Sequence, residues 1–155
     1  MIRKYGIAGL IALIIGFPLA GKSETIDWQG HAEGVEKAVQ ENKKIFIHFQ
    51  ADWCTYCVKM DEETFSDSEV IRYLNEHFIS IRVNGDRAAE LRQIYKVPGY
   101  PDNRFLTRKR DPIFQFFGFQ GPEVFMVLLK YVHTDSFKTM TPVQFLESGS
   151  DKSDF

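Results

Sequence analysis

The chain has 155 residues, of which 44% are hydrophobic and 26% charged, and these proportions suit one globular domain. Its formal net charge is −2, and its one basic run, Arg108-Lys109-Arg110, is followed at once by Asp111-Pro112. A nucleic-acid-binding domain needs a basic stripe, and the balance of acidic and basic residues excludes one here. The short basic run is instead typical of a solvent-exposed hairpin turn.

The first 21 residues have the pattern of a secretory signal peptide. Arg3 and Lys4 precede an uncharged fourteen-residue stretch, Gly6–Leu19, and the small pair Ala20-Gly21 follows. The stretch is shorter than the about 20 residues that a membrane-spanning helix needs. We expect cleavage and export, with a periplasmic or equivalent location, and an uncleaved membrane anchor is the alternative.

The remaining sequence predicts strands that alternate with helices. Strands are expected at Glu24–Trp28, Ile45–Phe49, Phe78–Val83, Arg104–Thr107 and Ile113–Phe119. Helices are expected at Gly34–Asn42, Thr55–Thr64, Ser66 or Asp67 to His77, Ala88–Tyr95 and Pro122–His133. This order predicts an α/β fold with a small mixed sheet covered by helices on both faces.

The end of the chain is predicted to lie outside the main domain. From Lys138 onward the apolar pattern fades, and Ser148–Asp154 has the composition of a disordered tail. We therefore expect a signal peptide over residues 1–21, a domain over 22–137, and a partly disordered extension over 138–155.

Cys54 and Cys57 are the only cysteines, and they follow a predicted buried strand at the start of a helix. A bridge across two intervening residues closes too small a loop to stabilise the fold much, so the pair is chemical. The free N–H groups at a helix N-terminus stabilise a thiolate at Cys54. Cys57, one helical turn further on, can attack a mixed disulfide formed at Cys54.

A Cys-x-x-Cys pair can also belong to a zinc site, or it can be inert and structural. Structural zinc takes four ligands, usually with a second Cys or His pair at short spacing. The histidines offer no such spacing; they are His31, His48, His77 and His133. The strand, the tryptophan, the helix start and a downstream proline together favour a redox dithiol.

The sequence around the cysteines resembles the thioredoxin superfamily. The resemblance is carried by Trp53-Cys54-x-x-Cys57 and by Val97-Pro98-Gly99-Tyr100-Pro101. The longer string from Ala51-Asp52-Trp53-Cys54 to Glu63-Thr64-Phe65-Ser66-Asp67 is similar to the C-terminal thioredoxin domain of DsbD-type thiol-disulfide interchange proteins and their stand-alone relatives. The similarity runs from about Ile26 to His133 and implies the thioredoxin fold.

The resemblance also implies which residues surround the cysteines. Tyr100-Pro101 stands where the family has a cis proline that faces the dithiol, with the preceding residue offering backbone groups to an extended substrate. Trp53 is expected to pack beside the dithiol and to shape the contact surface. Asp102 replaces the threonine usual after this proline, and we expect it to make the local groove more acidic.

Two polar residues complete the implied site. His48 stands where the family buries an aspartate that handles the proton of the second cysteine, and Arg82 stands where a lysine is frequent. A cation beside His48 favours neutral imidazole, which can still accept the proton of Cys57; the alternative is a core histidine bonded to backbone. Asp61 stands where the DsbD domain has a glutamate near its active site, where it would oppose the thiolate, or it lies on a solvated helix face.

The resemblance and the residues together predict an exported thiol-disulfide oxidoreductase that reduces protein disulfides. Thr55-Tyr56 places no histidine between the cysteines, which favours a reductase; the alternatives are a disulfide isomerase or oxidase, or a non-enzymatic binding module whose pair stays oxidised. No organic cofactor and no metal are expected, because the dithiol carries the electrons. Expected partners are protein thiol or disulfide substrates and a membrane electron donor of the DsbD type, with no nucleic acid, and we expect a monomer.

Overall fold

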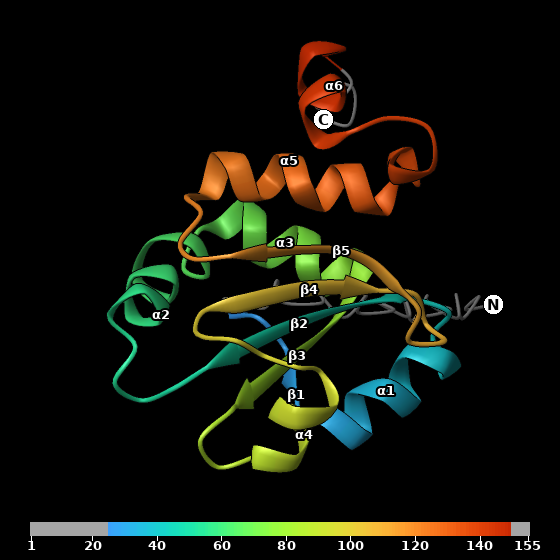
Figure 1. The fold of residues 1–155 in the computed structure, drawn as a ribbon. Helices are drawn as coiled ribbons and strands as arrows, with labels where there is room; N and C mark the ends of the chain where they lie inside the picture. Colours follow the sequence, from blue (N-terminus) through green and yellow to red (C-terminus); the bar gives the residue numbers. More distant parts are fainter. Residues whose placement is uncertain (1–24, 150–155) are drawn as a thin grey trace, which may run out of the picture.

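The computed structural model describes residues 25–149, and in these residues a single mixed sheet forms the centre of the fold (Figure 1). The strand order is β1-β3-β2-β4-β5. The strands are β1 (Trp28–Gln29), β2 (Lys44–Gln50), β3 (Phe78–Asn84), β4 (Asp102–Leu106) and β5 (Pro112–Phe117). β2 runs parallel to β3 and antiparallel to β4, and β3 in turn runs parallel to β1. The predicted mixed sheet is confirmed.

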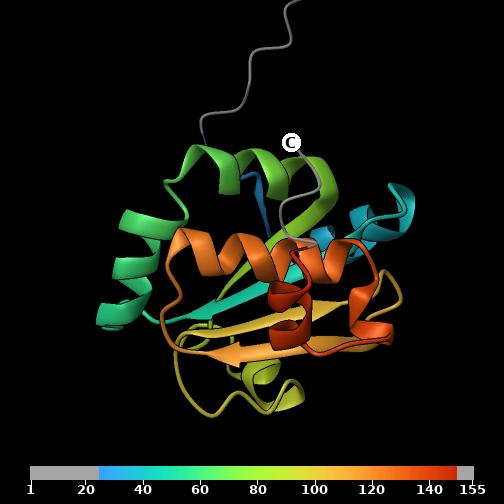
Figure 2. The same ribbon diagram turned by 90° about the horizontal axis from the view of Figure 1, so that it is seen from above.

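Helices cover both faces of the sheet, as the alternating pattern predicts. α1 (His31–Gln40) and α4 (Ala89–Ile94) lie on one face, and α3 (Ser68–His77) and α5 (Pro122–His133) lie on the other (Figures 1 and 2). Because both faces are covered, every residue from Ile45 to Phe49 is buried. The odd positions of this stretch pack with α1 and α4, and Phe46 packs with α3 and α5.

The segment after β2 carries the cysteines and forms two helical pieces instead of one. α2 (Thr55–Lys59) continues directly into η1 (Met60–Thr64), a π-helical turn. Both pieces lie at the end of the sheet where β2 ends (Figure 1). π-helical turns are rare and concentrate at functional sites. The predicted range Thr55–Thr64 is correct, although the sequence does not predict the change of pitch.

The start of α3 follows from one side chain. Asp67 precedes the helix, and its carboxylate accepts hydrogen bonds from the backbone N–H groups of Glu69 and Val70, both at 3.0 Å. This satisfies two of the free donors at the helix start. Of the two predicted capping residues, Ser66 and Asp67, the structure therefore selects Asp67.

The chain continues after α5 in a way that the sequence does not predict. A short 3₁₀ helix, η2 (Ser136–Lys138), leads to α6 (Pro142–Glu147), which lies against α5 on the side away from α3 (Figure 2). Phe145 anchors α6, with 1% of its surface exposed. The sequence does not predict this helix within the extension expected over residues 138–155. The predicted signal peptide and most of the predicted tail lie outside the described residues.

Candidate active site

Cys54 and Cys57 form a disulfide at the point where the sheet meets α2. Cys54 is the residue that precedes the first helical position, and Cys57 lies in the first turn. Their Cα atoms are 5.2 Å apart, and the exposed fractions are 4% for Cys54 and 2% for Cys57. The segment after β2 thus holds both cysteines with very little of their surface exposed.

The helix start directs a hydrogen-bond donor at one of the two sulfur atoms. The backbone N–H of Cys57 donates to Sγ of Cys54 at 3.1 Å. In the reduced protein the same N–H, together with the positive end of the helix dipole, would stabilise a negative charge on Cys54. This geometry is what a nucleophilic Cys54 requires.

The segment before β4 completes the surface around the disulfide. The Tyr100–Pro101 peptide bond is cis. The Tyr100 side chain packs against the buried cluster of Ala51, Cys54 and Cys57. Two segments that lie more than forty residues apart in the sequence therefore meet at the disulfide.

Trp53 is an exposed aromatic side chain next to the disulfide. It exposes 71% of its surface, and its ring lies edge-on to that of Tyr100 with 5.8 Å between ring centroids. Its indole N–H donates to the carboxylate of Asp86 at 2.7 Å. Tyr56, between the cysteines, is exposed as well. An oriented but accessible indole is suited to contact another protein.

His48 is completely buried on the sheet face that α3 and η1 cover. Burial lowers the pKa of His48 to about 3; the hydrogen bond to Asn103 raises this pKa, and the charge of Arg82 lowers it. The imidazole is therefore neutral at physiological pH. Its Nδ1 atom lies 2.7 Å from Oδ1 of Asn103, a side chain that sequence reasoning missed. The antiparallel register of β2 and β4, which brings the two residues opposite each other, cannot be read from local spacing.

Asp61 and Arg82 form an ion pair next to the buried histidine. The Arg82 guanidinium contacts the Asp61 carboxylate at 2.5 Å, and it stacks on the Trp28 ring at 4.2 Å from the centroid. The Asp61 side chain is 39% exposed. A carboxylate that is paired with a guanidinium destabilises a nearby thiolate less than an unpaired carboxylate does.

The prediction that Asp102 makes the local groove more acidic is wrong. Asp102 is completely buried, and its carboxylate binds the Arg104 guanidinium through two hydrogen bonds, at 2.6 and 3.0 Å. Gln115 donates a third hydrogen bond at 3.1 Å. The side chain points to the sheet face opposite His48, because neighbouring residues of a strand alternate in direction. Asp102 therefore stabilises the hairpin of β4 and β5 and adds no charge to the groove beside the disulfide.

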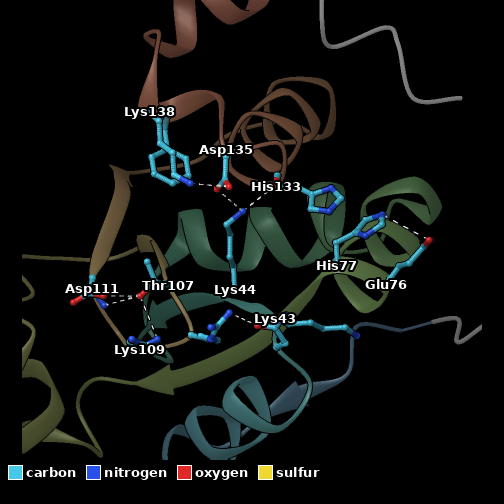
Figure 3. Close-up of a pocket in the computed structure, with 13 residues that line it drawn as sticks. Lys43, Lys44, Glu76, His77, Thr107, Lys109, Asp111, His133, Asp135 and Lys138 are labelled. Carbon is cyan, nitrogen blue, oxygen red and sulfur yellow. Dashed lines mark hydrogen bonds and ion pairs between the residues drawn. The ribbon is translucent and has the colours of Figure 1, made fainter.

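A surface hollow of about 630 Å³ lies at the other end of the sheet, where β2 begins (Figure 3). One of its cations stabilises the end of a helix: the Lys44 ammonium donates to the carbonyl of His133, the last residue of α5, at 2.9 Å and pairs with Asp135 at 2.8 Å. Arg108 and Lys109 lie at its rim in the exposed turn between β4 and β5, as predicted. The hollow is remote from the disulfide and is not part of the candidate site.

Residues 25–149 contain no helix long and apolar enough to cross a membrane. In the same part of the chain, no three His, Cys, Asp or Glu side chains are grouped so that they could hold a metal ion.

Comparison with curated proteins finds relatives over half of the chain or more, among them the following two. Human spermatogenesis-associated protein 20 is 31% identical over an alignment of 96 residues, and the match covers 56% of this chain and 12% of that protein. The disulfide bond reductase DsbH of Chlamydia pneumoniae is 28% identical over an alignment of 93 residues, and the match covers 52% of this chain and 56% of that protein. The chain thus spans a small part of the first relative and about half of the second.

Solved structures support the fold. A thioredoxin from Thermus thermophilus superposes with a TM-score of 0.65 and 27% identity, covering 70% of this chain and 87% of that one. The oxidised C-terminal domain of DsbD from Neisseria meningitidis superposes with a TM-score of 0.54 and 21% identity, covering 66% of this chain and 90% of that domain. The second likeness concerns the fold alone.

The family described as Thioredox_DsbH, protein of unknown function DUF255, matches residues 16–134. That match includes β1 to β5, both cysteines and all of α5. Because it covers more than half of the chain, the chain belongs to this family of thioredoxin-fold proteins.

Proposed function

We propose that this chain is a thiol-disulfide oxidoreductase that reduces disulfides in other proteins. The observation that carries the proposal is the Cys54–Cys57 disulfide at the start of α2, with the Cys57 N–H directed at Sγ of Cys54. Membership of the family and the likeness to a disulfide bond reductase support the same activity.

The two cysteines take different roles. In the reduced protein the Cys54 thiolate attacks a substrate disulfide, forms a mixed disulfide, and releases one substrate thiolate. Cys57 then loses its proton and attacks Sγ of Cys54, which breaks the mixed disulfide and releases the second substrate thiolate. The substrate gains two electrons and the Cys54–Cys57 pair becomes oxidised, so the cycle needs no organic cofactor.

Four neighbouring side chains support this exchange. Trp53 and Tyr100, which lie edge-on to each other, form the surface against which a substrate docks, and the backbone before Pro101 offers hydrogen bonds to an extended peptide. His48 is the acceptor for the Cys57 proton, a role its neutral imidazole permits. Asp61 acts through its ion pair with Arg82, which limits its effect on the thiolate.

The cellular setting is inferred from the N-terminal sequence. We propose that residues 1–21 direct export and are removed, and that residues 22–137 and 138–155 are the working domain and its extension. A reductase in an oxidising compartment needs a supply of electrons. A membrane donor of the DsbD type is the partner that we propose, and the domain works as a monomer.

Trapping of mixed disulfides tests the assignment of roles. Reduced wild-type protein should reduce a protein disulfide with dithiothreitol as the electron source, and Cys54→Ser should abolish this activity. Cys57→Ser should accumulate a mixed disulfide with the substrate, visible on a non-reducing gel, because the first attack survives and resolution does not. Equal trapping by the two variants would contradict the assignment, and no reduction by the wild type would refute the function.

A further inference from the structure

His48 and Asn103 form an isolated polar pair inside the core. They lie opposite each other on β2 and β4, both are completely buried, and Nδ1 of His48 is 2.7 Å from Oδ1 of Asn103. The rings of Trp28 and Phe65 pack around the imidazole. A buried imidazole with one hydrogen-bond partner has its protonation pattern determined by that partner.

Met60 determines which way the Asn103 amide points. The amide nitrogen of Asn103 lies 3.8 Å from Sδ of Met60. A thioether sulfur only accepts hydrogen bonds, so the NH₂ group must face Met60 and the amide oxygen must face His48. An oxygen accepts only, and Nδ1 of His48 therefore carries the hydrogen.

This arrangement leaves Nε2 of His48 as the nitrogen with a free lone pair. Nε2 is buried, and it has no hydrogen-bond partner among the described residues. The charged groups next to the imidazole are Arg82, its neighbour on β3, and Asp61, which pairs with Arg82. The Arg82 cation and the burial keep the resting imidazole neutral, so Nε2 carries no hydrogen before a proton is transferred to it.

We propose that Asn103 is a positioning residue that holds His48 in the Nδ1–H tautomer and so keeps Nε2 ready to accept the Cys57 proton. The inference rests on the proposed function. Met60 lies one helical turn after Cys57 in the continuous α2–η1 segment, so the contacts from Met60 to Asn103 to His48 connect the cysteine helix with the imidazole.

The proton and the electrons balance in the resolution step. As Cys57 attacks Sγ of Cys54, the Cys57 proton passes to Nε2, and the bond between Cys54 and the substrate breaks. The departing substrate thiolate then takes one proton, and the imidazolium returns to its neutral Nδ1–H form. With the other tautomer the hydrogen on Nε2 would block this transfer.

Nitrogen NMR of the imidazole in the reduced full-length chain tests the tautomer directly. Bare and protonated ring nitrogens have well separated ¹⁵N shifts, and the His48→Gln variant identifies the signals. We expect a protonated Nδ1 and a bare Nε2. A hydrogen on Nε2 in the wild type would overturn the inference, whatever the variants do.

The lifetime of the mixed disulfide tests the consequence. After rapid mixing with a peptide disulfide, acid quenching and mass spectrometry, we expect Asn103→Leu to resolve the mixed disulfide about tenfold more slowly, as for the loss of one hydrogen bond. Asn103→Asp, which still accepts from Nδ1, should keep the tautomer and restore most of the rate. Ser80→Ala is the control, because the Ser80 hydroxyl is buried and has no hydrogen-bond partner among residues 25–149, so its removal leaves the bond between Asn103 and His48 intact.

A second variant keeps the test decisive if Asn103→Leu does not fold. Met60→Leu removes the sulfur that orients the amide, and we expect part of the His48 population to change tautomer and the resolution rate to fall. An unchanged rate and pH profile in a folded Asn103→Leu protein would refute the role of Asn103 while leaving the oxidoreductase function intact. Failure of the wild type to form any mixed disulfide would instead refute the function.

Discussion

Gly85 lies so close to Tyr100 that a Cβ atom at Gly85 would overlap the Tyr100 hydroxyl and lie 2.7 Å from two carbons of its ring. Gly85 directly follows β3, and its N–H donates to the carbonyl of Gln50, the last residue of β2, at 2.8 Å. The turn after β3 is thereby joined to the end of β2. The absence of a side chain at Gly85 is what lets the ring before Pro101 rest on this turn.

We expect Gly85→Ala to destabilise the oxidised protein by about 1–3 kcal/mol, the usual cost of inserting a methyl group into a packed region. Disulfide reduction should also slow, because Tyr100 must move from the disulfide. Chemical denaturation and the reduction assay measure the two effects. Gly30→Ala is the control, since nothing lies within 4 Å of a Cβ there, and an equal response of the two variants would contradict the packing argument.

The reduction potential of the Cys54–Cys57 pair should lie nearer to that of thioredoxin, about −270 mV, than to that of a strong oxidant, about −120 mV. The helix start favours the thiolate, but no histidine lies between the cysteines to stabilise it further. Each 30 mV corresponds to about 1.4 kcal/mol for this couple, so the difference is easily resolved. Equilibration with glutathione and thiol labelling give the value.

A potential near the oxidant's would make the protein an oxidase, and an intermediate one would favour an isomerase. A pair that stays oxidised under strong reductant would indicate a binding module.

His48 should make the fold sensitive to acid. Its pKa is about 3 in the folded protein against an ordinary value of 6.5, so between these pH values the unfolded chain holds one more proton. Stability should therefore fall as the pH drops from 6.5 towards 3, by up to about 1.4 kcal/mol per pH unit, and the contribution should level off below that range.

Denaturant unfolding of the wild type and of His48→Gln at pH 7, 5 and 4, conditions we choose to bracket this range, measures the difference. His31→Gln is the comparison, because burial and Arg110 also lower the pKa of His31, which is only partly buried. Identical pH slopes for the wild type and His48→Gln would show that His48 is not held neutral.

Phe145 should make α6 an integral part of the fold. Its ring is 1% exposed and packs on Tyr131 of α5, with 5.7 Å between ring centroids. We expect Phe145→Ala to cost about 3–5 kcal/mol of unfolding free energy, as for other buried aromatic side chains. The adjacent Leu146, which is 54% exposed, provides the matched Leu146→Ala control, for which little change is expected. Comparable losses in the two variants would argue against a specific anchor.

The fold was predictable where local patterns determine the structure. β2 is a mostly apolar run because both faces of the sheet are covered, β3 alternates apolar and polar residues, and the cap at Asp67 follows from its side-chain chemistry. α6 was not predicted, because it is short and buries one side chain, Phe145, so it has no repeating apolar pattern that would indicate a helix.

The candidate site was predictable only in part, because several of its relationships depend on strand register. The cysteines and Tyr100-Pro101 stand out in the sequence, and they meet in the structure. Asn103 becomes the partner of His48, and Asp102 turns to the other face, only once β4 is aligned with β2. Asp102 and Asn103 are neighbours in β4, yet their side chains point to opposite faces of the sheet. No local sequence pattern predicts which face each side chain takes.

The strand order also determines which parts of the sheet can open. β2 is held by ladders on both of its edges, whereas β1 and β5 each pair along one edge. Thermal fluctuations that fray the sheet therefore begin at β1 or β5 and reach β2 last. Cys54 and Cys57 follow the strand that opens last. Repeated cycles of thiol-disulfide exchange at these cysteines therefore leave the central strands of the sheet paired.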